Sequence, residues 1–114
     1  MEQLTSPISV GTLRNIAEKM FGNLVKAVVD VRRRVIVVDA ELHSDEEAFL
    51  LENGSRQQDL WGINFYPEFE RDSFDFIEFD SMINLRPSQN NRSRGVEDER
   101  KREQIIAIVK DWVV

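Results

Sequence analysis

The sequence predicts an α+β fold of order α-β-β-α-β-β-α, a mainly antiparallel sheet of two hairpins with helices packed on one face. Amphipathic helical patterns lie near both ends of the chain, and a third helical pattern lies near its middle. Two pairs of strand-like runs lie between them, and the first pair is separated by too few residues for a crossover helix. Packing such helices on one sheet face buries their apolar stripes.

The first helix is predicted by Ser9 as its N-cap, a single apolar stripe and Gly22 as a left-handed stop. The stripe consists of Leu13, Ile16, Ala17, Met20 and Phe21. Strands at residues 23–31 and 35–38 follow, joined by three arginines, and we expect them to form an antiparallel hairpin. Apolar residues on both faces of the first strand indicate a central position in the sheet.

The second half of the chain predicts a helix, two strands and a last helix. Ser44 and Glu47 fit a capping box that begins the middle helix, and Asn53-Gly54 ends it. Strands are expected at residues 60–66 and 76–86, the second as one long strand because its alternation is unbroken, although a turn at Asp80-Ser81 would split it. Asp98 caps the last helix, whose buried face is Ile105, Ile108, Val109 and Trp112.

Length and composition bound the class of protein. A chain of 114 residues is expected to form a single domain, residues 1–114. The absence of cysteine excludes disulfides, thiolate catalysis and cysteine-ligated metals. No apolar run approaches the ~18 residues of a membrane span, and no secretory signal is evident, so we expect a cytoplasmic protein without a membrane partner.

Charge is unevenly distributed along the chain. The net charge is −6, and residues 39–80 hold thirteen acids against two bases. This acidic total argues against binding to long duplex DNA, which requires a basic surface, but it allows a local anion site.

The arginine-rich loop, residues 86–95, is the best candidate binding site. Three guanidinium groups and several polar side chains lie close together in it, before a helix N-terminus. The candidate ligand-binding residues of this loop are Arg86, Ser88, Gln89, Asn91, Arg92 and Arg94. They suit a phosphate or carboxylate, and the glycine spacing of a Walker loop is absent. Alternatively, Arg86 and Arg94 pair with acidic side chains such as Glu78 and Asp80 and hold the loop in place.

A polar sheet face adjoins this loop. If Trp61 faces the helices, Asn64 faces away, and Asn84 and Arg86 share its side on the next strand. This face is either an ordinary solvated surface or a platform for the same anionic ligand. The leading hypothesis is therefore a small binding module for a nucleotide, RNA or another phosphate or carboxylate.

An enzyme is the alternative function. His43 is the only histidine, and with Glu41 or Asp80 it could act as an acid–base group in a small hydrolase or endoribonuclease, with Arg86 stabilising charge. A capping segment with a packed histidine explains the same residues. One histidine cannot form a histidine-rich zinc site, so neither a metal nor a cofactor is expected.

A third possibility is an interaction protein that forms a homodimer. A short chain with an exposed edge strand can cover that edge with a second copy.

Three segments carry a resemblance to a known family: ELHSDEE, DLWGIN and DSMINLRPSQNNRSRGVED. They resemble a family of small uncharacterised prokaryotic proteins known only as a domain of unknown function. The likeness extends over nearly the whole chain. It implies a prokaryotic origin and a stand-alone single domain, and it implies no particular reaction.

Overall fold

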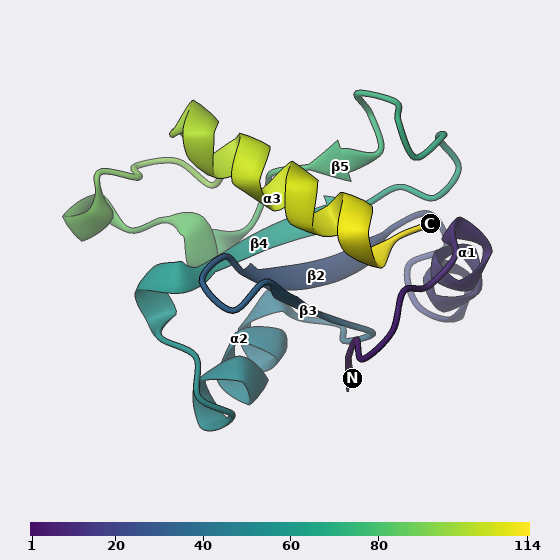
Figure 1. Ribbon diagram of the computed structural model, residues 1–114, viewed down its shortest axis with the longest axis horizontal. Coiled ribbons are helices and arrows are strands. Elements are labelled where there is room, and N and C mark those ends of the chain that lie inside the picture. The colour runs from purple at the N-terminus through teal and green to yellow at the C-terminus, as the bar shows by residue number, and fades with distance from the viewer.

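A five-stranded antiparallel sheet forms the centre of the computed structural model, which describes residues 1–114 (Figure 1). The strands are β1 (Glu2–Gln3), β2 (Val25–Asp30), β3 (Val35–Val38), β4 (Leu60–Phe65) and β5 (Ile77–Glu78), in the spatial order β1-β3-β2-β4-β5. The helices are α1 (Val10–Lys19), α2 (His43–Glu52) and α3 (Glu99–Trp112), with short 3-10 helices at Gln57–Asp59, Met82–Asn84 and Pro87–Gln89. The predicted α+β class is confirmed. No helix is both long and apolar enough to cross a membrane.

The predicted hairpin of β2 and β3 is confirmed, and β2 is the central strand. Its turn is held by Asp30, whose carboxylate accepts the backbone N–H groups of Arg32 and Arg33, both at 2.9 Å. Arg34 adopts a positive φ of 57° in this turn. The buried aspartate thus supplies the turn chemistry that the three arginines lack.

Both chain ends are tied into the fold. The unpredicted strand β1 pairs with β3, and two residues are too few to give a pattern. Ile8 and Val113 form a parallel bridge, in which the N–H of Val114 donates to the carbonyl of Ile8 at 2.8 Å.

The prediction of one long strand at residues 76–86 was wrong. Only Ile77–Glu78 pairs with β4, and a 3-10 helix follows Ser81. The Ser81 hydroxyl accepts the N–H of Ile83 at 3.3 Å, while the Ser81 N–H donates to the carbonyl of Arg94. These local bonds replace the ladder, because serine side chains compete for backbone groups.

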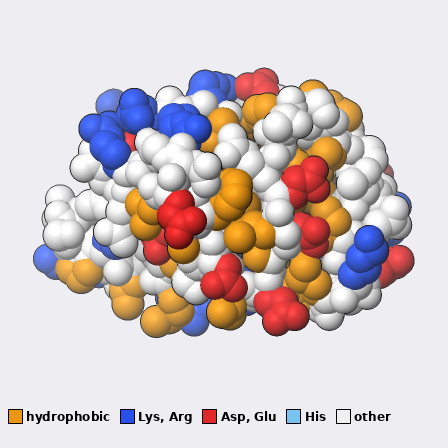
Figure 2. Space-filling model, turned by 90° about the horizontal axis from the view of Figure 1, so that it is seen from below, with side chains coloured by type: hydrophobic (Ala, Val, Ile, Leu, Met, Phe, Trp, Pro, Cys, Tyr) orange, Lys and Arg blue, Asp and Glu red, His pale blue; other side chains and the backbone are white.

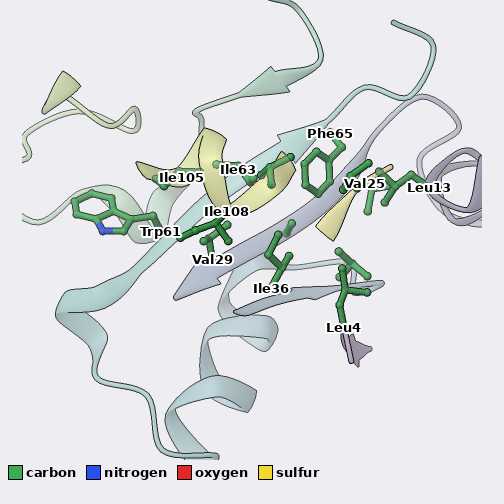
Figure 3. Packing of buried hydrophobic residues seen from close by; sticks show 14 of the residues in the cluster. Leu4, Leu13, Val25, Val29, Ile36, Trp61, Ile63, Phe65, Ile105 and Ile108 are labelled. Carbon is green, nitrogen blue, oxygen red and sulfur yellow. The ribbon is translucent and has the colours of Figure 1, made fainter. Parts of the chain in front are cut away.

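Helices cover both faces of the sheet, so the prediction of one covered face was wrong. One cluster of 18 buried apolar residues joins the sheet to α1 and α3; Figure 3 shows Leu13 and Ile108 directed into it. On the other face Leu50 of α2 packs against Val28, Val37 and Leu60. The inner strands are apolar on both faces, as a sheet between two helical layers requires.

The helix caps were predicted with mixed success. Ser9 caps α1 by accepting the N–H of Thr12 at 3.0 Å, and Asp98 caps α3. The predicted capping box of α2 is wrong, because this helix begins at His43 after Leu42, which makes no side-chain cap. Ser44 therefore lies inside the first turn.

Candidate functional site

The buried face of α2 carries ionisable side chains. His43, Glu46 and Leu50 follow at spacings of three and four and are all buried against the sheet. Glu46 is fully buried, and neither carboxylate oxygen has a hydrogen-bond partner. Burial raises the pKa of Glu46 to about 10, so the side chain is neutral at pH 7.

His43 is anchored to β4. Its Nε2 atom lies 2.8 Å from the carbonyl oxygen of Ile63, and burial lowers the pKa of the ring. The ring packs on Gly62, where a Cβ atom would lie 3.2 Å from His43 Cδ2 and 2.5 Å from Ser81 Cβ. Gly62 is therefore needed for helix α2 and the Ser81 segment to approach the strand together.

Asn84 and Asn91, two of the candidate ligand-binding residues, hold the framework together. The Asn84 side chain accepts the N–H of Gly62 at 2.8 Å and donates to its carbonyl at 2.9 Å, which continues the ladder where β5 has ended. The Asn91 amide donates to the carbonyls of Asn84 and Gly95 and accepts the N–H of Glu97. Both side chains are buried, so their hydrogen bonds go to the protein itself.

Asn64 lies in a polar row across the sheet. It pairs in register with Lys26 of β2 and Glu78 of β5. Its amide donates to the Glu78 carboxylate at 2.9 Å and to the Asp80 carbonyl at 3.2 Å, while its own oxygen has no partner. Asn64 and Glu78 thus form a polar pair on one sheet face, but Asn84 and Arg86 lie beyond β5 and do not extend it as a strand.

Arg86 points away from the Glu78 and Asp80 side chains that the sequence suggested as partners. Its Nη1 group donates to the carbonyl of Gln57, and its guanidinium lies 4.0 Å from the centre of the Trp61 ring. The side chain is buried, yet Nε and Nη2 have no partner. Burial lowers the pKa of Arg86, against the opposing charges of Glu47 and Asp59.

Glu47 and Trp61 complete what we name the Arg86 cluster: Glu47, Trp61 and Arg86. Glu47 Oε2 and Trp61 Nε1 also lack partners, so this cluster holds four of the seven buried unpartnered side-chain atoms. Burial raises the pKa of Glu47, while Arg86 and Gln57 oppose that shift. Unpaired polar atoms inside a protein are costly, and their concentration at one place marks a candidate site.

Apart from Asn91 and Gly95, the rest of the arginine-rich loop is exposed. Arg94 pairs with Asp80 at 2.7 Å, Gln89 donates to the carbonyl of Gln58 at 3.0 Å, and Arg92 has no ion pair. Ser88 is also exposed. The backbone N–H groups of Arg92 and Ser93 both donate to Glu97 Oε2, so this pair of donors is already filled. The three guanidinium groups of the loop thus have different surroundings and do not form one fork.

The enzyme candidates are brought together in part. The charges of Asp80 and Arg94 both act on the pKa of His43, whereas Glu41 lies exposed outside this group. Arg86 is not among the charges that act on the pKa of His43. No group of three or more His, Asp or Glu side chains could hold a metal ion.

The three segments that suggested the family meet at this site. The segment 41–47 supplies Glu47, the segment 59–64 supplies Trp61, and the segment 80–98 supplies Arg86. The model of one family, described as "Protein of unknown function (DUF5674)", matches residues 2–112. The chain belongs to this family. DUF5674 is thus an uncharacterised family, and no curated protein and no solved structure matches the chain.

Sequence reasoning missed Glu46, Glu47 and Trp61 in this DUF5674 protein. Glu47 was interpreted as part of a capping box, and Glu46 was not predicted to be buried, although it precedes the apolar Leu50 by four residues and so shares its face. Trp61 was assigned to the core, which is correct for most of its ring. Its contact with Arg86 joins residues 25 positions apart and has no local signal.

Proposed function

We propose that the protein binds a small ligand carrying a carboxylate or phosphate group, and that Arg86 is its anchor. The observation that carries this proposal is the unpartnered edge of the buried guanidinium, formed by Nε and Nη2. These two N–H groups form the planar fork that binds a carboxylate or phosphate with two parallel hydrogen bonds. A fork that is already desolvated and fixed loses little freedom on binding.

The surroundings of Arg86 support a fixed geometry. The carbonyl of Gln57 holds Nη1, and the ring of Trp61 holds the guanidinium plane. The indole N–H of Trp61 is a further unpartnered donor. Glu47, whose pKa is raised by burial, adds a carboxyl that in its protonated form donates a hydrogen bond to an anionic ligand.

Arg86 lies beside two short 3-10 helices, Gln57–Asp59 and Pro87–Gln89. Arg86 and Gln89 each donate to the segment Gln57–Asp59, which connects it to Pro87–Gln89. In the proposed complex the ligand reaches Arg86 once these contacts open, and the exposed side chains of Ser88, Gln89 and Arg92 are near it in the chain. A single buried fork favours a small anion over a nucleic-acid strand, which is bound through many separate phosphate contacts.

The face seen in Figure 2 fits a local anion site better than an extended nucleic-acid surface. Figure 2 shows a face on which acidic and apolar side chains are mixed, while Lys and Arg side chains gather mainly at one end. A duplex nucleic acid requires a continuous basic surface, and this face does not provide one.

The test is binding to a panel of anions, measured by thermal shift and calorimetry. The panel contains inorganic phosphate, mononucleotides, small mono- and dicarboxylates and a short single-stranded RNA. We expect at least one small anion to raise the Tm of the wild-type protein. In Arg86→Lys, which keeps the charge and loses the fork, that shift should disappear. Arg100→Ala, an exposed change on α3, should retain it. The absence of any shift in the wild type, or a full shift in Arg86→Lys, would overturn the proposal.

A hydrolase or endoribonuclease is the second candidate, because Asp80 and Arg94 form an ion pair and the charges of both act on the pKa of His43. A neutral histidine beside a carboxylate and a guanidinium suits acid–base chemistry on a phosphodiester. The same RNA should then be cleaved by the wild type and by Glu41→Gln, but not by His43→Asn. Intact RNA after incubation with the wild type would exclude this candidate.

A further inference from the structure

We propose that the groove between β5 and α3 is an interface between two copies of the chain, with Phe74 of each copy inserted into the groove of the other. This surface is separate from Arg86, so the proposal does not depend on the proposed ligand.

The groove has an apolar floor. It lies between the loop of residues 66–75, β5 and α3, with a volume of about 1080 Å³. Phe69, Ile77, Phe79 and Ile106 contribute its apolar surface. An open apolar hollow of this kind on a small domain indicates an interaction surface.

Phe74 is the counterpart of this groove. It lies in the loop at the groove's rim and is 98% exposed, the most exposed of the large apolar side chains. Moving an exposed phenyl ring out of water into an apolar pocket is favourable. Aromatic side chains that fill a pocket on the partner contribute most of the binding free energy in many interfaces. Because anchor and pocket belong to the same chain, the surface is complementary to a second copy of itself.

The free edge of β5 in one copy could pair with the same edge in the second copy. It is the last strand of the sheet and pairs with β4 only through Glu78 and Ile77. Its outer side has no neighbouring strand. Antiparallel pairing of two such edges around a two-fold axis would cover both of them.

Charges along the groove match in the exchanged arrangement. Asp72 and Asp75 flank Phe74 in the loop, and α3 presents Arg102 and Lys110 to the groove. Arg71 of the loop is matched by Glu99 and Glu103 of α3. Within one copy Arg71 already pairs with Asp72 at 3.8 Å, and Arg102 donates to the carbonyl of Glu97. In the exchanged arrangement Lys110 of one copy would therefore face the aspartates of the other copy's loop, and the two-fold axis repeats this pairing.

Sedimentation velocity over a micromolar to millimolar concentration series tests this proposal. We expect the wild type to shift from monomer to dimer with concentration, and Phe74→Ala to remain monomeric at every concentration. Since Phe74 is almost fully exposed, its removal should leave the Tm of the monomer unchanged. The control is Leu42→Ala, a second exposed apolar residue that does not line the groove, and it should dimerise like the wild type.

A second variant addresses the charges. Lys110→Glu should weaken the dimer by about tenfold or more, because it places like charges opposite the aspartates of the partner loop. A wild type that sediments as a monomer throughout, or a Phe74→Ala variant that dimerises normally, would overturn the proposal.

Discussion

The sheet face beneath α1 and α3 buries an apolar cluster, whereas the face beneath α2 and the neighbouring end of β4 bury ionisable and amide side chains. The first holds 18 buried apolar residues in one cluster, and the second holds a cluster of only four. The second region buries His43, Glu46, Asn64, Asn84 and Arg86 instead. Apolar burial drives folding, while buried polar groups reduce stability unless they are fully paired. Apolar burial on the first face therefore offsets the free-energy cost of burying polar groups in the second region.

The largest expected effect lies on the apolar face. Phe65 is fully buried, and its ring centre lies 5.6 Å from that of Phe76. Phe65→Ala should lower the free energy of unfolding by about 3–5 kcal/mol, because it removes apolar burial and leaves a cavity. Denaturant unfolding monitored by circular dichroism measures this loss. A loss below about 1 kcal/mol would show that the comparison of the two faces is mistaken.

On the polar face, a substitution at Glu46 should have the opposite effect and raise the free energy of unfolding. Its pKa is about 10 in the folded protein and 4.5 ordinarily, so the folded state keeps a proton that the unfolded state releases. Stability contributed by this group is present below pH 4.5 and is lost as the pH rises towards 10. Glu46→Gln removes this loss and should raise the free energy of unfolding at pH 7 by about 2–3 kcal/mol.

The pH dependence provides the control for Glu46→Gln. The gain should shrink near pH 4.5, where the unfolded glutamate is also protonated, and should grow between about pH 7 and pH 9. A gain of equal size at all pH values, measured by denaturant unfolding, would contradict a buried neutral Glu46.

Two arginines of the same loop, Arg86 and Arg92, allow a comparison of the smallest expected changes in stability. Arg86→Ala should cost about 1–3 kcal/mol, because it leaves the Gln57 carbonyl unpaired and removes the contact with Trp61. Arg92 is exposed and has no ion pair, so Arg92→Ala should stay within about 0.5 kcal/mol. Equal losses at the two positions would mean that the whole loop is structural.

Local signals predicted the elements that depend on neighbouring residues. Ser9 and Asp98 were identified as caps, and the closely spaced apolar runs around Arg32–Arg34 predicted the β2–β3 hairpin. A cap or a tight turn is decided within a few residues, so it can be recognised in the sequence. The apolar residues on both faces of β2 also correctly indicated its central position.

Tertiary contacts decided what the sequence did not predict. The alternation at residues 76–86 continues through Ser81, but Asn84 takes over the hydrogen bonds of Gly62 that a longer β5 would have made. Likewise, the sequence placed the three guanidinium groups of the loop close together, but it could not show that Arg86 lies against the ring of Trp61. Such side-chain contacts join residues about twenty positions apart, so they produce no periodic pattern that could be recognised in the sequence.

The bridge between Ile8 and Val113 has a consequence for the order in which the chain assembles. It joins two segments at opposite ends of the sequence, so it closes the longest loop that the fold contains. During translation the β2–β3 hairpin can form early, but α1 cannot reach its final hydrogen bonds until residue 114 has left the ribosome. Such contacts raise the contact order and slow folding. Residues 8–10 therefore make their last contacts late, whereas β1 before them pairs with β3, which lies much earlier in the chain.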